Sequence, residues 1–315
     1  MVRYYLGIDG GSSSTAVALI DDQQQLLWSE SYPPLSPADL SSNTIAAHTA
    51  RILDDALAAL PEGQEIAALG LGISGLNRPA DRDYVLQTIT EIYPSKVHHA
   101  ADHEIALWGA LGSTDVEGAI LIAGSGALAY GQTASGETAL TGGNGHVIGD
   151  DGGGYWLGVQ VLRACVQALD GRGEQTVLVD WLEEQLRAAG DYVRGTNLTV
   201  QDILRYSYAR ETSASAIASL SAGLISASGD EDAVSISILE DAADALEHLA
   251  GTVLDTLKLG SSTLVLAGSW LARDLILRRP LMDRLQPRYP ELSLVLPQAD
   301  AATGAALLAL HRSGG

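Results

Sequence analysis

The chain has 315 residues, of which 46% are hydrophobic, so it exceeds what one core usually supports and two domains are expected. Its 39 Asp and Glu against 18 Lys and Arg give a net charge of −21, which disfavours nucleic acid and anionic membranes as partners. The single cysteine, Cys165, excludes intrachain disulfides, thiolate zinc sites and iron–sulfur clusters held within one chain, and it fits a reducing compartment.

The first half of the chain predicts a β-meander followed by alternating helices and strands. The turn between the first two strands is rich in Gly and Ser, and Asn43 is expected to be the N-cap of the first helix. The expected strands are 4–8, 15–20, 26–31, 66–73 and 97–101, and the expected helices are 44–60, 83–92 and 102–111.

The pattern of strand, Gly/Ser turn and strand then begins again. Strands are expected at 119–123, 127–132, 137–140, 263–267 and 292–296, and helices at 155–169, 177–189, 200–208, 214–225, 233–258 and 301–310. The helix 233–258 carries a core-facing apolar stripe, and Gly260 is expected to stop it. Self-similarity over more than a hundred residues indicates a duplicated α/β unit. We expect domains at 1–114 and 115–300 that face each other across a cleft, with the last helix, 301–315, packing on the first.

The ends and apolar stretches of the sequence predict neither secretion nor a membrane anchor. The N-terminus has one Arg, a short apolar run and a Gly turn, without the h-region or cleavage site of a signal peptide. The longest apolar stretch, Ala119–Tyr130, is interrupted by glycines and is too short to span a bilayer. We therefore expect a cytoplasmic protein.

Two Gly/Ser turns predict a phosphate site. In the segment Asp9–Thr15 the glycines let successive backbone N–H groups converge on a phosphate, and Asp9 can hold Mg²⁺ through water. This motif alone also fits an ordinary hairpin with an Asx turn. Its repetition at Gly124-Ser125-Gly126 favours the phosphate interpretation, because two such loops can clamp a triphosphate.

Asp102 follows a short strand and opens a helix, where the macrodipole favours an ionised carboxylate. Such a carboxylate can accept a proton from a sugar hydroxyl, although the same residue type is also a common N-cap. The nearby His98, His99 and His103 lack the spacing of zinc ligands, and we interpret them as surface or strand-end histidines.

Two further segments suit small-molecule binding. The glycine-dense stretch from Gly142 to Gly154 is a loop that brings backbone close to a ligand, and Asn144, Asp150 and Asp151 give it donors and acceptors for sugar hydroxyls. The buried strand that ends at Gly268 finishes in small residues, which would allow a flat adenine to lie against the backbone.

The order of these motifs resembles the N-acetylglucosamine kinase-like branch of the BadF/BadG/BcrA/BcrD ATPase family, over nearly the whole length. The resemblance rests on the Asp9–Thr15 turn, Ser42-Asn43 before a helix, Asp102, the Gly124–Ala127 loop, the Gly143–Gly153 loop and the Val265–Ser269 strand. It implies a duplicated actin-like, ribonuclease H-like fold of two domains with a central nucleotide cleft. It also implies an ATP- and Mg²⁺-dependent hexosamine kinase that phosphorylates the 6-hydroxyl of N-acetylglucosamine or glucosamine. Relatives are often dimers, so a homodimeric state is left open.

The resemblance assigns a role to each matching residue. Asp102 would be the catalytic base and Asp9 the metal-binding residue. The expected ATP-binding residues are Gly10, Gly11, Ser12, Ser13, Thr15, Gly124, Ser125, Gly126, Gly268 and Ser269, and the expected sugar-binding residues are Asn43, Asp102, Asn144, Gly145 and Asp150.

Some positions depart from the family pattern, and rival functions exist on the same fold. Asn144 stands where the family has Trp and Ala127 where it has Ser, so the choice between an acetamide and a free amine stays open. A dehydratase-activating ATPase would need cluster-binding cysteines, and a sugar-sensing repressor would need a helix-turn-helix before the first strand. An actin-like ATPase without a sugar substrate would not require Asn43 or the glycine-dense loop.

Overall fold

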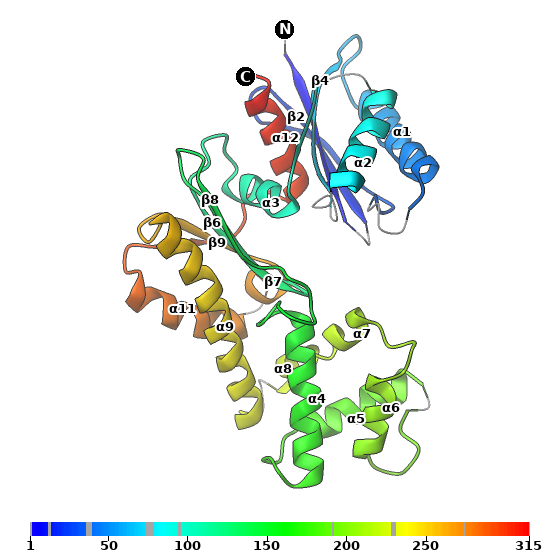
Figure 1. Cartoon of the computed structure of the whole chain (residues 1–315), viewed down its shortest axis with the longest axis vertical. Helices are drawn as coiled ribbons and strands as arrows, with labels where there is room; N and C mark the ends of the chain where they lie inside the picture. Colours follow the sequence, from blue (N-terminus) through cyan, green and yellow to red (C-terminus); the bar gives the residue numbers. More distant parts are fainter. Residues whose placement is uncertain are drawn as a thin grey trace. The chain divides into compact units, whose positions relative to one another are not determined.

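The computed structural model describes residues 2–11, 14–35, 40–73, 79–93, 96–190, 192–227, 231–273 and 275–314. The chain divides into two units (Figure 1). Unit 1 comprises Met1–Gly118, Gln132–Gly136 and Leu296–Gly315, and unit 2 comprises Ala119–Gly131 and Glu137–Val295. None of the helices in these ranges is both long enough and apolar enough to cross a bilayer.

Unit 1 is built on a five-stranded sheet in the order β3-β2-β1-β4-β5. The strands are β1 (Tyr4–Gly10), β2 (Thr15–Asp21), β3 (Leu26–Tyr32), β4 (Ile66–Ile73) and β5 (Lys96–Ala100). β2 runs antiparallel to β1 and β3, whereas β4 runs parallel to β1 and β5. The carboxyl ends of β1, β4 and β5 therefore lie at one edge of the sheet.

The two faces of this sheet are packed in different ways. α1 (Ser42–Ala58) and α2 (Pro79–Ile92) cover one face, where branched side chains such as Ile52 and Ile89 form the core with Leu69 and Leu71. α3 (Asp102–Leu111) and α12 (Ala301–Arg312) lie on the other face (Figure 1). The apolar runs of β1 and β4 are explained by this burial on both sides.

The packing of α12 is a backbone-to-backbone contact made possible by glycines. A Cβ added to Gly7 would lie 1.9 Å from the carbonyl oxygen of Ala302, and one added to Gly70 would lie 1.8 Å from that of Ala305. A Cβ on Gly304 would likewise lie 1.9 Å from the carbonyl oxygen of Ile105 in α3. No other residue type fits at such positions, so these glycines fix how closely α12 approaches the sheet and α3.

Unit 2 repeats the sheet of unit 1. Its strands are β6 (Gly118–Ala123), β7 (Ala127–Gln132), β8 (Thr138–Gly142), β9 (Thr263–Ala267) and β10 (Ser293–Val295), in the order β10-β9-β6-β7-β8. β9 runs parallel to both β6 and β10, as β4 does to β1 and β5. Each sheet thus has three strands that are consecutive in sequence and two further strands added in parallel. This correspondence confirms the predicted duplicated α/β fold.

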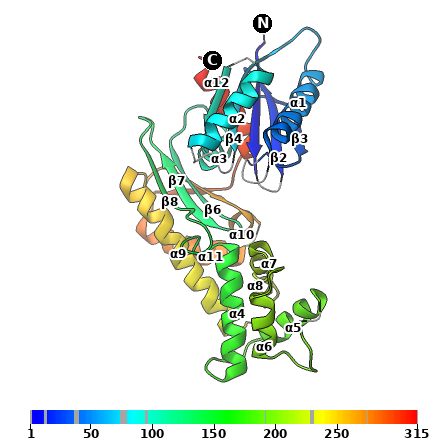
Figure 2. The ribbon, with the colours of Figure 1, turned by 45° about the vertical axis from the view of Figure 1, so that its right-hand side comes forward.

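A group of helices in unit 2 has no counterpart in unit 1. α4 (Gly154–Asp170) packs against α5 (Leu178–Ala188), α6 (Val200–Ser207), α7 (Ala214–Ser219) and α8 (Ala222–Ala227) (Figure 2). Cys165 is buried on the apolar side of α4, as the periodicity predicts, and burial raises the pKa of its thiol to about 12. A thiol in this environment stays protonated and unreactive at neutral pH.

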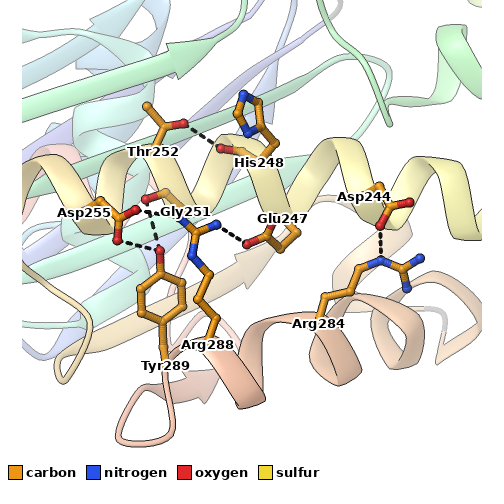
Figure 3. Close-up of polar contacts among 9 residues, drawn as sticks. All are labelled: Asp244, Glu247, His248, Gly251, Thr252, Asp255, Arg284, Arg288 and Tyr289. Carbon is orange, nitrogen blue, oxygen red and sulfur yellow. Dashed lines mark hydrogen bonds and ion pairs between the residues drawn. The ribbon is translucent and has the colours of Figure 1, made fainter.

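Ionic contacts hold α9 (Ala233–Leu257) to α11 (Leu275–Arg288), which follows the short helix α10 (Ser269–Ala272) (Figure 3). Arg284 pairs with Asp244, and Arg288 bonds to Glu247 and to Asp255 at 2.5 and 2.6 Å. The interior positions Leu239, Ala242, Leu246 and Val253 of α9 are buried, so the predicted core-facing stripe is confirmed. Arg284 and Arg288 lie at the edge of this apolar stripe.

Three local predictions are wrong. Ser41, not Asn43, is the N-cap of α1, because the Ser41 hydroxyl accepts the N–H of Thr44. The helix expected at 214–225 is two short helices, and an added Cβ on Gly223 in the second would lie 2.7 Å from the Trp181 ring. α9 ends at Leu257, and its C-cap is Lys258 with a left-handed φ of 58°, so Lys258 and not Gly260 stops the helix.

Substituting Gly70 should strongly destabilise the protein, since its new Cβ would meet backbone that has no rotamer to change. We expect Gly70→Ala to lower the free energy of unfolding by about 3 kcal/mol, measured by urea denaturation. Gly195→Ala is the matched control, because a Cβ there is 3.7 Å from its nearest neighbour. It should change stability by less than about 0.5 kcal/mol. Equal stability of the two variants would contradict the close packing of α12.

Candidate active site

Strand register brings two predicted site residues to one edge of the sheet in unit 1. Asp9, the next-to-last residue of β1, pairs with Gly72 of β4, and Gly72 pairs with Ala100 of β5. Asp102 follows Ala100 by two residues and opens α3. Asp9 and Asp102 therefore lie at the same edge of the sheet.

A third carboxylate, Asp300, joins this edge. It is the N-cap of α12 and accepts the N–H of Thr303 at 2.8 Å. The residues just before it are tied to the end of α3, because Gln298 and Ala299 donate to the carbonyls of Ala110 and Gly109. Asp300 is not among the predicted site residues, although an Asp before a Gly/Ala-rich helix is a typical N-cap signal.

The environment of Asp9 opposes its ionisation. Burial, followed by the negative charges of Asp102 and Asp300, raises the pKa of Asp9 to about 6. Asp102 and Asp300 are therefore close enough to Asp9 for their charges to act on it. A cation at this edge would relieve their repulsion, and oxygen ligands are the type that Mg²⁺ prefers.

Asp102 has the opposite tendency. Hydrogen bonds from His103 lower the pKa of Asp102 in spite of burial, which acts to raise it. Two carboxylates on the same edge thus have their pKa values moved in opposite directions, a pattern found where acid and base roles are divided.

Asp102 is not the N-cap of α3, although its carboxylate accepts the first-turn N–H of His103. The N-cap of α3 is Ala101, which has no side-chain cap, and Asp102 is the first helical residue. The Asp102 carboxylate instead contacts the next residue, His103, whose side chain is only 13% exposed. The interpretation of His103 as a surface or strand-end histidine is therefore wrong, because it lies in the first turn of a helix and is largely buried.

The first predicted phosphate turn is described in part. Gly10 ends β1, and Gly11 donates its N–H to the carbonyl of Ser14 at 2.9 Å, which closes the hairpin. Ser12 and Ser13 lie outside the described residues. Thr15 begins β2 and is fully buried, and its hydroxyl has no hydrogen-bond partner in the described part of the chain.

Backbone contacts join the second predicted phosphate turn to the glycine-dense loop of unit 2. The N–H groups of Gly154 and Tyr155 donate to the carbonyls of Gly124 and Ser125 at 2.8 and 2.9 Å. A Cβ added to Gly153 would lie 2.6 Å from the backbone of Gly126. In the structure, main-chain contacts therefore hold these two predicted elements together.

Three of the expected sugar-binding residues, Asn144, Gly145 and Asp150, lie in this loop with different exposures. Asn144 and Gly145 are exposed, and Gly149 donates to the carbonyl of Gly145. Asp150 is partly buried and has a left-handed φ of 61°. A Cβ added to Gly126 would lie 2.6 Å from the Asp150 Oδ2 atom, so this carboxylate borders the Gly124–Gly126 turn directly.

The end of β9 reaches the same turn. Gly268 has a φ of 84°, and a Cβ there would lie 2.3 Å from the carbonyl oxygen of Ala123, the last residue of β6. Ser269 follows it and is exposed. In unit 2 the structure thus brings Gly124, Gly126, Asp150 and Gly268 into one neighbourhood.

Asn43 is the remaining expected site residue. It is the second residue of α1, in unit 1, and its side chain is exposed. It is therefore accessible to a ligand, and its role in sugar binding stays a prediction.

Comparisons with known proteins agree on one family. A model of the BadF/BadG/BcrA/BcrD ATPase family matches residues 6–309. An N-acetylmuramic acid/N-acetylglucosamine kinase of Clostridium acetobutylicum is 28% identical over 312 residues, covering 98% of each chain. An N-acetyl-D-glucosamine kinase of Dictyostelium discoideum is 26% identical over 320 residues, again covering 98% of each.

A solved structure extends this similarity to the fold. The crystal structure of a candidate N-acetylglucosamine kinase from Chromobacterium violaceum matches with a TM-score of 0.70 and 25% identity. The match covers 98% of this chain and 99% of that one. The similarity spans both units, in agreement with the two-domain actin-like fold that the sequence motifs imply.

The raised pKa of Asp9 predicts that this side chain lowers stability at neutral pH. The carboxyl loses its proton near pH 3.8 when unfolded and near 6 when folded, so the folded state holds more protons in this window and stability falls as pH rises through it. In metal-free buffer at pH 7.5, Asp9→Asn should raise the free energy of unfolding by about 3 kcal/mol.

The same variant should match the wild type near pH 4, where both carry an uncharged side chain at this position. Denaturation curves across this pH range check the prediction. The exposed Asp54 of α1 provides the control, since Asp54→Asn should show no such pH-dependent gain. A gain for Asp9→Asn that is independent of pH would show that charge is not its cause.

Proposed function

Because the chain belongs to the BadF/BadG/BcrA/BcrD ATPase family, we propose that it is an ATP-dependent kinase that phosphorylates the 6-hydroxyl of N-acetylglucosamine or glucosamine. Both curated relatives carry N-acetylglucosamine in their names. The observation that carries the proposal is the state of Asp102, an ionised carboxylate at the sheet edge that also bears the Asp9-Gly10-Gly11 turn.

Asp102 acts as the general base in this proposal. Its carboxylate is 48% exposed, so it can reach a substrate, and its lowered pKa keeps it ready to accept a proton at neutral pH. It would take the proton from the attacking sugar hydroxyl and orient that oxygen towards the γ-phosphate of ATP.

The ATP phosphates would be bound by backbone N–H groups of the Gly10–Ser13 and Gly124–Gly126 turns, with adenine against Gly268. A Cβ built on Gly124 meets no atom within 4 Å, so this turn has free space beside it. The close approach of Gly268 to Ala123 brings the end of β9 beside the same turn, which supports this position for adenine. The partly buried Asp150 and the exposed Asn144, together with the Gly145 backbone and Asn43, would hold the sugar.

Asp9 would hold Mg²⁺, and the residues present fit this ion. Asp9 offers a carboxylate oxygen in a buried and electronegative environment. Among the described residues no group of three or more His, Cys, Asp or Glu side chains could hold a metal ion by itself. Mg²⁺ keeps several waters and takes few carboxylates, so the Asp9 carboxylate would be sufficient to hold it. When bound, the ion would neutralise phosphate charge, and the protein would supply alignment.

Phosphorylation of a panel of sugars tests the proposed function. Glucosamine, N-acetylglucosamine, N-acetylmannosamine, glucose and N-acetylmuramic acid are each incubated with ATP, and ADP formation and the phosphorylated position are measured. We expect ADP release to depend on glucosamine or N-acetylglucosamine, with product at the 6-hydroxyl. Activity confined to glucose would refute the amino-sugar assignment, and ATP turnover unaffected by any sugar would refute the kinase.

Gly124→Val should remove ATP binding without unfolding the protein. The new side chain enters the free space beside the turn, so folding is expected to survive, but that space is the one assigned to phosphate. We expect at least a ~100-fold weaker ATP affinity by calorimetry, with an unchanged melting temperature. Gly126→Val is a poorer test, since its side chain would collide with Asp150. Unaltered affinity in Gly124→Val would place the phosphates elsewhere.

Asp102→Asn should reduce turnover while leaving binding intact. Asn has nearly the same size and can still accept the N–H of His103, but it cannot take a proton as a carboxylate does. We expect kcat to fall about 10²–10⁴-fold, with dissociation constants for ATP and sugar within about threefold of wild type. A near-normal kcat would remove Asp102 from the mechanism.

A further inference from the structure

Two hydrogen bonds reach the Asp102 carboxylate from the neighbouring residue, and both go to one oxygen. His103 donates its backbone N–H to Asp102 Oδ1 at 2.8 Å, and its ring Nδ1 lies 3.2 Å from the same atom. Within the described ranges no other side chain is bonded to this carboxylate. His103 thus engages Asp102 Oδ1, and Oδ2 receives no hydrogen bond from His103.

Helix geometry alone does not produce this contact. Side chains of consecutive helical residues point about 100° apart and do not normally face each other. The contact therefore requires particular rotamers of both residues. The His103 side chain is 13% exposed and that of Asp102 is 48% exposed, so the imidazole is the packed partner and the carboxylate is the accessible one.

The chemistry of the pair sets the tautomer. An ionised carboxylate only accepts hydrogen bonds, so the ring atom facing it must carry a hydrogen. His103 is then present with Nδ1–H. A hydrogen-bond donor held in place by packing fixes the orientation of its acceptor. Other active sites orient their catalytic side chains in the same way.

We propose that His103 is the positioning residue for the catalytic base: its Nδ1–H holds Asp102 Oδ1, so that Oδ2 faces the acceptor hydroxyl of the sugar. This inference rests on the proposed role of Asp102. His103 itself touches neither ATP nor sugar and acts only through Asp102. Its contribution should therefore appear in kcat, and not in the affinity for either substrate.

The test compares two substitutions of similar size. His103→Leu fills the buried space without a donor, whereas His103→Asn places an amide N–H close to the position of Nδ1. We expect kcat to fall 10- to 100-fold in His103→Leu and to stay within threefold of wild type in His103→Asn. Dissociation constants for ATP and sugar should stay within threefold in both. The exposed His99 supplies the control, since His99→Leu should leave kcat unchanged.

A double variant separates positioning from an independent role. If His103 acts through Asp102, then Asp102→Asn combined with His103→Leu should be no slower than Asp102→Asn alone. A further tenfold loss would overturn the proposal, as would a normal kcat in His103→Leu or equal losses in His103→Leu and His103→Asn. Those results would leave the kinase assignment intact if Asp102→Asn is impaired. A normal kcat in Asp102→Asn would instead refute the base role on which the inference depends.

A measurement on the wild-type protein does not depend on how the variants fold. The ¹⁵N shifts of the His103 ring report which nitrogen carries hydrogen. We expect a hydrogen on Nδ1, either in the neutral Nδ1–H tautomer or in the imidazolium ion. A neutral ring with hydrogen on Nε2 alone would direct a lone pair at the carboxylate and would overturn the proposal.

Discussion

Backbone-to-backbone packing of α12 positions the carboxylates of unit 1. With glycines at 7 and 70 beneath it and Gly304 against α3, the helix lies as close to the sheet as main-chain atoms allow. Its N-cap, Asp300, is thereby brought to the edge where β1 and β5 deliver Asp9 and Asp102. The close spacing of these carboxylates therefore depends on the glycines that let α12 approach.

The site combines a carboxylate that resists ionisation with one that favours it. Burial and two negative neighbours act on Asp9, whereas Asp102 is compensated by His103. Cation binding at this edge would relieve the repulsion. In the proposed kinase a metal-bound nucleotide would therefore be favoured here, although the net charge of −21 would repel free ATP.

Much of this arrangement could be predicted from the sequence, because apolar runs bounded by glycines define strands clearly. The repeated strand, turn and strand pattern revealed the duplication, and the order of motifs pointed to Asp9 and Asp102. The contact with His103 could not be predicted, since it depends on rotamers of adjacent residues that periodicity does not encode. Asp300 was missed for a related reason: it lies far from Asp9 in sequence, and the close approach of α12 alone makes them neighbours.

The union of the Gly124–Gly126 turn with the glycine-dense loop is formed by main-chain atoms alone. The carbonyls of Gly124 and Ser125 and the N–H groups of Gly154 and Tyr155 do not depend on the side chains at exposed loop positions, provided that Gly153 carries no Cβ. Side chains such as Asn144 can therefore change over evolutionary time without disturbing the neighbouring turn. If this loop binds the sugar as proposed, its exposed positions are free to vary with the substrate while the neighbouring turn keeps its geometry.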